Sequence, residues 1–215
     1  METALDASVP TQEVILDAAE EIFADNGFHG ATTRAIANRA QVNAALIHYY
    51  FGSKEALFEA VFARRSEAIN EERRARLAAL RRAGPPELEA VLEALLRPTV
   101  ALGRDPARGG AHYARLVVHV ASGTDARSRR MTGERYNAIA RVFIDAMVGA
   151  VAGLSRDDAV RCYMNAIAIG MSLMAPTGRA EDLSNGALRD DDLDTIISGA
   201  VRFIAAGTRA IAHAR

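Results

Sequence analysis

Residues 32–58 read TTRAIANRAQVNAALIHYYFGSKEALF. Two short segments with apolar residues at helical spacing lie in this stretch, and only residues 41–43 separate them. The first follows the capping pair Thr32 and Thr33, and the second spans residues 44–51. Two short helices joined by so tight a turn follow the plan of a helix-turn-helix DNA-binding unit, although many αα-hairpins share this outline.

On either side of this stretch the pattern is also helical. Residues 11–26 alternate apolar and acidic positions at three- and four-residue spacing, which predicts an amphipathic helix that ends at Gly27. Residues 1–10 have little periodicity and are expected to form a flexible arm. Downstream, residues 53–83 contain no glycine or proline and predict one long connecting helix, which residues 84–86 (Gly-Pro-Pro) end.

The composition supports an all-α fold. The chain has 215 residues, of which 50% are hydrophobic and only 6% aromatic, with no tryptophan. Frequent Ala, Leu, Val and Ile favour helices packed on helices over a sandwich or barrel. The single cysteine, Cys162, excludes an intrachain disulfide and a cysteine zinc site. His112 and His119 share a helix face but have no nearby carboxylate partner in the sequence, so we expect no metal site, and we expect no cofactor.

Beyond the proline pair the sequence predicts a larger helical body. Its expected helices span residues 87–103, 109–122, 126–153, 156–175 and 191–213. A polar, glycine-containing stretch over residues 176–190 is expected to be a loop. The chain is thus predicted to contain a compact N-terminal helical unit at 11–52, a connecting helix at 53–83 and a larger helical body at 84–215.

Charge is distributed unevenly around the two short helices. Residues 26–54 contain no acidic residue but include Arg34, Arg39 and Lys54. Residues 1–62 nevertheless carry three basic and nine acidic residues, a net charge of −6, which is unusual for a protein that binds DNA. We therefore expect the acidic side chains of the first helix to face away from the duplex.

Residues 32–58 closely resemble the signature of TetR-family transcriptional regulators, in which a short recognition helix ends in aromatic residues before a Ser-Lys-Glu-x-Leu start to the fourth helix. The resemblance implies a three-helix DNA-binding domain at residues 11–52, a long fourth helix at 53–83 and a helical ligand-binding and dimerisation domain at 84–215. Such regulators are usually repressors that a small molecule releases from DNA. This chain departs from the family pattern at four positions: Gln41 and Ala45 replace frequent glycines, and His48 and Tyr50 exchange the common Tyr and His.

The resemblance and the helix geometry together predict the DNA contacts. Thr33 and Lys54 lie at helix N-termini and are expected to bind phosphates, while Asn43, His48 and Tyr49 are the polar candidates for base edges or phosphates. Alanines at the start of the recognition helix can offer only apolar contact to thymine methyl groups. The predicted contacts are Thr33, Arg34, Asn43, Ala44, Ala45, His48, Tyr49, Tyr50 and Lys54. The predicted core positions are Ile36, Ala37, Val42, Ile47 and Phe51.

Apolar stripes with several methionines in the body predict either a ligand pocket or ordinary core. In the pocket interpretation, His119 supplies a polar group and Arg135 permits an anionic head group on a hydrophobic or aromatic effector. The predicted pocket residues are Tyr113, Leu116, Val117, His119, Val120, Arg135, Tyr136, Phe143, Met147, Tyr163, Ile167 and Met171.

The last helix carries an apolar stripe that predicts a two-fold interface, with the helix at 156–175 as its partner. The predicted interface residues are Tyr163, Ile167, Ile196, Ile197, Ala200, Val201 and Ile204. A dimer would read a palindromic or pseudo-palindromic operator in double-stranded DNA. The arginine-rich run over residues 73–76 is interpreted as a solvated helix face.

The leading hypothesis is a dimeric, ligand-responsive repressor in the cytoplasm. An activator of the same fold is the alternative within this class. An enzyme is not expected, because the chain has no nucleophile elbow, phosphate loop or paired-carboxylate motif. A helical interaction protein with a degenerate DNA-binding unit remains a separate alternative. No apolar run was found long enough to predict a membrane span.

Overall fold

The computed structural model describes residues 10–213, and every regular element in that range is a helix. The all-α prediction is therefore confirmed. The predicted arm at residues 1–10 lies outside the described residues, apart from Pro10. The elements are α1 (Thr11–Gly30), α2 (Thr33–Ala40), α3 (Ala44–Phe51), α4 (Lys54–Ala83), α5 (Leu88–Gly103), η1 (Pro106–Arg108), α6 (Gly110–Ser122), α7 (Ala126–Ala150), α8 (Arg156–Leu173), α9 (Arg179–Leu183) and α10 (Leu193–His213).

Local sequence signals explain where the first helices begin and end. Gly27 has φ 66° and interrupts the helical geometry of α1 at the predicted position, since a left-handed φ suits glycine. The Thr32 hydroxyl accepts the backbone N–H of Ala35 at 3.1 Å and caps α2. The Ser53 hydroxyl accepts the N–H of Ala56 at 3.1 Å and caps α4 in the same way.

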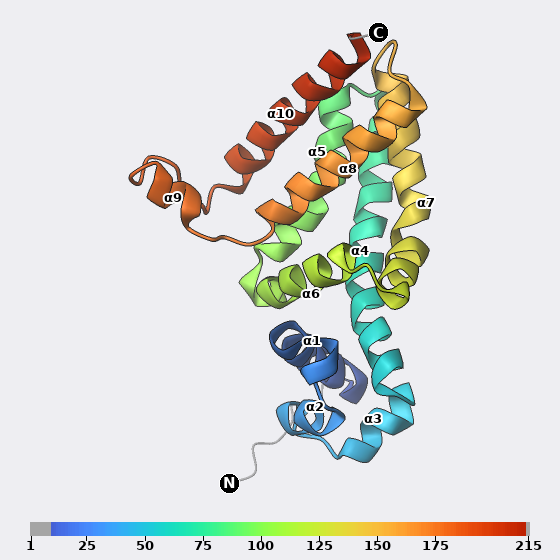
Figure 1. The fold of residues 1–215 in the computed structure, drawn as a ribbon, viewed down its shortest axis with the longest axis vertical. Helices are drawn as coiled ribbons and strands as arrows, with labels where there is room; N and C mark the ends of the chain where they lie inside the picture. Colours follow the sequence, from blue (N-terminus) through green and yellow to red (C-terminus); the bar gives the residue numbers. More distant parts are fainter. Residues whose placement is uncertain (1–9, 214–215) are drawn as a thin grey trace.

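The molecule is elongated, with α2 and α3 at one end and α8 and α10 toward the other (Figure 1). The 30-residue helix α4 runs from the α3 end into the body, and α6 lies across the middle of the molecule, above α1. The stretch predicted as a loop, residues 176–190, contains the short helix α9. Both α4 and α6 therefore contact α1 as well as helices of the body.

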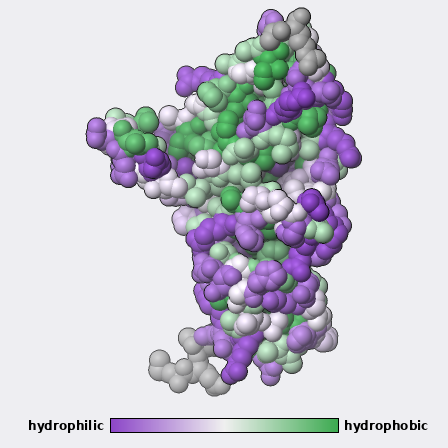
Figure 2. Space-filling model, in the orientation of Figure 1, coloured by the Kyte–Doolittle hydropathy of each residue, from purple (hydrophilic) through white to green (hydrophobic). Residues whose placement is uncertain are grey.

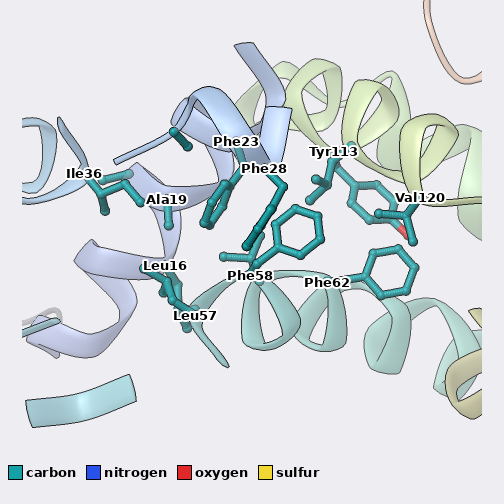
Figure 3. Packing of buried hydrophobic residues seen from close by; sticks show 14 of the residues in the cluster. Leu16, Ala19, Phe23, Phe28, Ile36, Leu57, Phe58, Phe62, Tyr113 and Val120 are labelled. Carbon is teal, nitrogen blue, oxygen red and sulfur yellow. The ribbon is translucent and has the colours of Figure 1, made fainter. Parts of the chain in front are cut away.

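An aromatic cluster joins the first helices to α6. Phe58 on α4 makes edge-to-face contacts with Phe23 and Phe28, with ring centroids 4.9 and 5.2 Å away. Tyr113 and Val120 of α6 lie in the same hydrophobic cluster (Figure 3). Helices α1, α4 and α6 therefore share one hydrophobic core.

The body packs around α5, which lies against α4, α7, α8 and α10. Helix α10 is long and apolar enough to cross a membrane by length and composition, contrary to the expectation from the sequence. In the structure it instead packs along α5, with Ile197, Val201 and Ile204 buried in the core of the body. Packing within the chain thus accounts for this buried face of the helix, whereas Phe203 and Ile211 are exposed.

Candidate DNA-binding surface and effector cavity

Helix α3 presents one face to solvent at the end of the molecule. Ile47 is fully buried and holds the helix on the domain core, whereas Ala44, Ala45 and His48 are exposed. Tyr49 is 80% exposed, so its ring contributes little to the core. This arrangement leaves a face of eight-residue helix α3 free to enter a DNA major groove.

Gln41 closes the turn between α2 and α3. It adopts a left-handed conformation, with φ 56° and ψ 39°, and caps the C-terminus of α2. The N–H of Val42 then donates to the carbonyl of Ala37 at 3.0 Å. The turn therefore keeps helix-turn-helix geometry at a modest cost in backbone strain.

Asn43 has a role that the sequence prediction did not include. Its Oδ1 accepts the N–H of Ala45 at 2.9 Å and caps α3. A bidentate contact to adenine requires both ends of the amide. The capping bond occupies one lone pair of Oδ1 and fixes the orientation of the amide, while the amide NH₂ stays available to donate to a base or phosphate.

The imidazole of His48 is oriented by the end of α3. Its Nδ1 lies 3.0 Å from the carbonyl oxygen of Gly52, which can only accept, so Nδ1 carries the proton. The other ring nitrogen, Nε2, is left for an outside partner. Neutral His48 would therefore accept a hydrogen bond from a base amino group at Nε2.

Lys54 also has a role within the protein that the sequence prediction did not include. Its ammonium donates to the carbonyl oxygens of Phe28 and Ala31, each at 3.0 Å, and lies 4.5 Å from the centre of the Phe28 ring. These partners belong to the end of α1 and the segment after it, so the side chain joins α4 to the first helix. Two of the three N–H donors of the ammonium are thus used within the protein, which leaves one for a phosphate.

Replacing Lys54 with Ala should lower the free energy of unfolding by about 1–2 kcal/mol, because two carbonyls lose a charged donor. Urea denaturation would measure this change. Arg34→Ala is the matched control, since Arg34 is exposed and has no hydrogen-bond or ion-pair partner among residues 10–213, and it should stay within about 0.5 kcal/mol of the wild type. Unchanged stability of Lys54→Ala with a flatter salt dependence of DNA binding would contradict this assignment.

The remaining predicted contacts surround α3. Thr33 is the first residue of α2 and is half-buried, Arg34 is exposed, and Tyr50 is 40% exposed with its ring 5.1 Å from that of Tyr49. Their positions agree with a surface that contacts the DNA backbone beside α3.

The acidic residues of α1 are paired within the protein. Arg64 of α4 contacts Glu13, Asp17 and Glu20 at 2.8–3.1 Å. Glu21 forms a two-bond ion pair with Arg39, at 2.6 and 2.9 Å. The carboxylates of α1 are thus held by arginines of α4 and α2, which explains how the N-terminal segment can be acidic while the α3 face carries no negative charge.

A partly enclosed cavity of about 160 Å³ lies in the body between α4, α5, α6, α7 and α8. Its walls combine apolar side chains with a few polar groups. The lining residues are Arg73, Leu96, Thr99, Val117, Ala121, Thr132, Tyr136, Asn137, Ala140, Tyr163, Met164, Ile167, Gly170 and Met171. Five residues predicted for the pocket are among them, namely Val117, Tyr136, Tyr163, Ile167 and Met171.

The other seven predicted pocket residues do not line the cavity. Helical periodicity identifies the buried face of a helix, but it does not show whether that face lines a cavity or packs on another helix. His119 is exposed, and Arg135 forms an ion pair with Glu67 at 2.9 Å. Core packing accounts for Tyr113, Leu116, Val120, Phe143 and Met147.

Arg73 is the main cavity residue that the sequence analysis missed. It is only 3% exposed, so its interpretation as part of a solvated face is wrong. Its Nε–H donates to the carbonyl of Leu95 at 2.9 Å, and Nη2 donates to the Thr99 hydroxyl at 2.8 Å. Arg73 lies at helical spacing between Ile69 and Leu77, which are both buried on α4. This spacing is the sequence signal that could have predicted a buried position for Arg73.

Four of the seven predicted dimer contacts are buried within the chain, and the other three stay a prediction. Ile197, Val201 and Ile204 are buried against the chain's own helices, while Tyr163 and Ile167 line the cavity. Ile196 and Ala200 are half-buried. The exposed apolar side chains on these two helices are instead Val160, Met164, Phe203 and Ile211. Figure 2 shows hydrophobic surface where α8 and α10 face the viewer.

Comparison with known proteins agrees with this architecture. Residues 15–61 match the family "Bacterial regulatory proteins, tetR family", and residues 93–207 match "Tetracyclin repressor-like, C-terminal domain". The HTH-type transcriptional regulator UidR of Escherichia coli K12 is 44% identical over 52 residues, 24% of this chain and 26% of that regulator. The match thus spans about a quarter of that relative.

Solved structures share the fold at low sequence identity. FadR, a fatty acid degradation regulator from Bacillus halodurans, has a TM-score of 0.67 at 16% identity and covers 95% of this chain and 99% of that chain. FadR from Bacillus subtilis, solved in complex with stearoyl-CoA, has a TM-score of 0.63 at 15% identity and covers 91% and 98%.

The fold and the exposed recognition helix define a helix-turn-helix protein with a helical body. The chain belongs to the TetR family. Members of this family are transcription regulators and not enzymes, and they bind DNA and small-molecule effectors.

Proposed function

We propose that the protein is a homodimeric repressor that binds a palindromic or pseudo-palindromic operator in the cytoplasm and is released when a small molecule enters the cavity. The observation that carries the proposal is that the two candidate sites share helices. Helix α4 begins beside α3 and supplies Arg73 to the cavity wall, and α6 supplies Val117 and Ala121.

Contacts between α6 and the first helix give the coupling a physical path. Arg115 of α6 forms an ion pair with Asp25 of α1 at 2.7 Å. Arg65 of α4 donates to Glu20 at 2.7 Å and to the carbonyl of Arg108 at 2.8 Å, which joins α1, α4 and the turn before α6. An effector that displaces α6 would therefore shift α1 and change the spacing of two recognition helices in a dimer.

Sequence-specific DNA binding is tested by fluorescence anisotropy with duplexes from the gene's upstream region, scrambled duplexes as controls, and several salt concentrations. We expect a clear preference for the upstream DNA and an affinity that falls steeply as salt rises. Equal binding to both duplexes at every salt concentration would contradict the proposal, and so would the absence of binding. That result would favour a helical interaction protein with a degenerate DNA-binding unit.

The direction of regulation needs a separate measurement. A reporter gene placed behind the bound operator should be transcribed less in the presence of the protein. Increased transcription would indicate an activator of the same fold, which DNA binding alone does not distinguish.

We place the dimer interface on the exposed faces of α8 and α10. Phe203 is 74% exposed and Met164 is 59% exposed, and an apolar groove runs between the two helices beside Phe203. Exposed apolar surface of this kind is typical of protein–protein contacts. In a two-fold dimer each side chain is buried twice.

Phe203→Glu should raise the dimer dissociation constant about 1,000-fold or more, because two interface aromatic residues are lost and two charges are buried. Sedimentation equilibrium at micromolar protein would then detect monomers. Val118→Glu on α6 is the control, since Val118 is also exposed but lies outside α8 and α10, and it should remain dimeric. A dimeric Phe203→Glu protein would place the interface elsewhere.

A further inference from the structure

Arg73 is a buried cation without an acidic partner. Arg73 is 3% exposed, and no aspartate or glutamate among residues 10–213 forms an ion pair with its guanidinium. A buried charge is strongly unfavourable unless it is paired and hydrogen-bonded. Other arginines that are largely buried in this chain, such as Arg65 and Arg104, do contact carboxylates. The unpaired charge therefore points to an anion that is supplied from outside the chain.

The hydrogen bonds of Arg73 leave a defined part of the guanidinium available. Nε–H and one N–H of Nη2 are used by Leu95 and Thr99, and one N–H of Nη1 makes a long 3.4 Å bond to Asn70 Oδ1. One N–H on each terminal nitrogen has no acceptor among the described residues. Two donors on neighbouring nitrogens match the two oxygens of a carboxylate.

Further polar groups in the same cavity also have no partner in the described part of the chain. The hydroxyl oxygen of Thr132 is buried and makes no hydrogen bond. The hydroxyl of Tyr163 makes none either, whereas that of Tyr136 lies 3.1 Å from the Tyr113 hydroxyl. Burial raises the pKa of Tyr163, so its hydroxyl stays protonated and can donate. The cavity thus offers hydroxyl donors as well as the cation.

The rest of the cavity is apolar and small. Leu96, Val117, Ile167 and Met171 form much of its wall. Gly170 has no side chain there, and a Cβ at this position would come within 2.9 Å of Leu96. The volume of about 160 Å³ is close to that of an engineered cavity of about 150 Å³ that binds benzene. One ring or a short alkyl chain therefore fits beside the charged group.

We propose that the cavity binds a small monocarboxylate with a single ring or a short apolar chain, and that Arg73 pairs with its carboxylate. The inference has two parts. That the carboxylate is the effector rests on the proposed function, whereas its binding in the cavity does not. Binding of the carboxylate is a property of the cavity itself and can be measured without DNA.

Calorimetry on the full-length protein without DNA tests the ligand class. The probes are benzoate, phenylacetate and hexanoate, each compared with the alcohol and the amine of the same skeleton. At least one carboxylate should bind about tenfold or more tightly than its alcohol, and the amines should not compete. The proposal is overturned if no carboxylate binds with a dissociation constant below about 10 mM, or if the alcohols bind equally well.

Substitution of the cation tests its role. Arg73→Met should weaken carboxylate binding about 30-fold or more and should leave alcohol binding nearly unchanged. Arg73→Lys keeps the charge but loses the paired donors, and an intermediate loss is expected. Arg76→Met is the matched control, since Arg76 is a half-buried arginine of the same helix that is paired with Glu72 and does not line the cavity, and it should bind as the wild type does. Full carboxylate affinity in both Arg73 variants would overturn the assignment.

Folding and function are monitored separately in these experiments. Urea denaturation of each variant identifies any loss of folding, and the selectivity of the wild type for carboxylates remains decisive if Arg73→Met does not fold. Carboxylate binding without operator binding would leave the ligand assignment standing and reject the repressor. Operator binding by a protein that binds no carboxylate would reject only the ligand assignment.

Discussion

Tyr49→Ala should weaken binding to the operator about 100-fold or more, since each good contact to a base contributes about 1–3 kcal/mol and a dimer carries the substitution twice. Tyr49 is 80% exposed on α3, and its ring contacts only the neighbouring Tyr50 among the aromatic residues described. Folding should therefore be unaffected. Anisotropy titrations with operator and scrambled duplexes would measure the loss, and circular dichroism would check helical content.

The matched control for Tyr49 is Leu183→Ala. Leu183 is 72% exposed on α9, which the structure places far from α3 (Figure 1). This variant should bind the operator with wild-type affinity. If Tyr49→Ala also bound with wild-type affinity and sequence preference, α3 would not be the recognition helix, and the proposed docking of the domain would be wrong.

The second large effect concerns stability. Phe58→Ala should lower the free energy of unfolding by about 3–5 kcal/mol, the usual cost of removing a buried phenylalanine. Phe58 is 3% exposed and is the ring of α4 that contacts both Phe23 and Phe28 of α1. Its removal leaves a cavity at the junction of α1, α4 and α6 (Figure 3). Operator binding should fall together with folding.

Urea denaturation followed by circular dichroism would measure the loss caused by Phe58→Ala. Tyr49→Ala is the control for an aromatic residue outside the core and should remain within about 0.5 kcal/mol of the wild type. A change below about 1 kcal/mol for Phe58→Ala would mean that the aromatic cluster does not hold the DNA-binding domain together.

Local signals in the sequence predicted the helices well. The capping residues Thr32 and Ser53 and the break at Gly27 depend on neighbours only a few residues away, so these features could be predicted from the sequence. The prediction ended the first helix at Gly27, whereas α1 extends beyond this break to Gly30. The buried positions Ile36 and Ile47 followed from periodicity for the same reason.

The site residues were harder to predict because their side chains are long or their partners are distant. Lys54 reaches carbonyls at positions 28 and 31, and Arg73 bonds to groups at positions 95 and 99. Helical periodicity placed Phe143 and Met147 on an apolar face but did not distinguish a cavity from a neighbouring helix. The same ambiguity affected α10, whose most apolar face packs on α5.

The sequence by itself determined the all-α fold, the helix-turn-helix and the family, since these follow from local capping, periodicity and a contiguous motif. Only the tertiary structure decided that Lys54 joins α4 to α1, that the acidic residues of α1 are paired, and that Arg73 is buried in the cavity. The physical reason is that hydrogen bonds and burial depend on which groups meet in space, and these groups come from helices far apart along the chain.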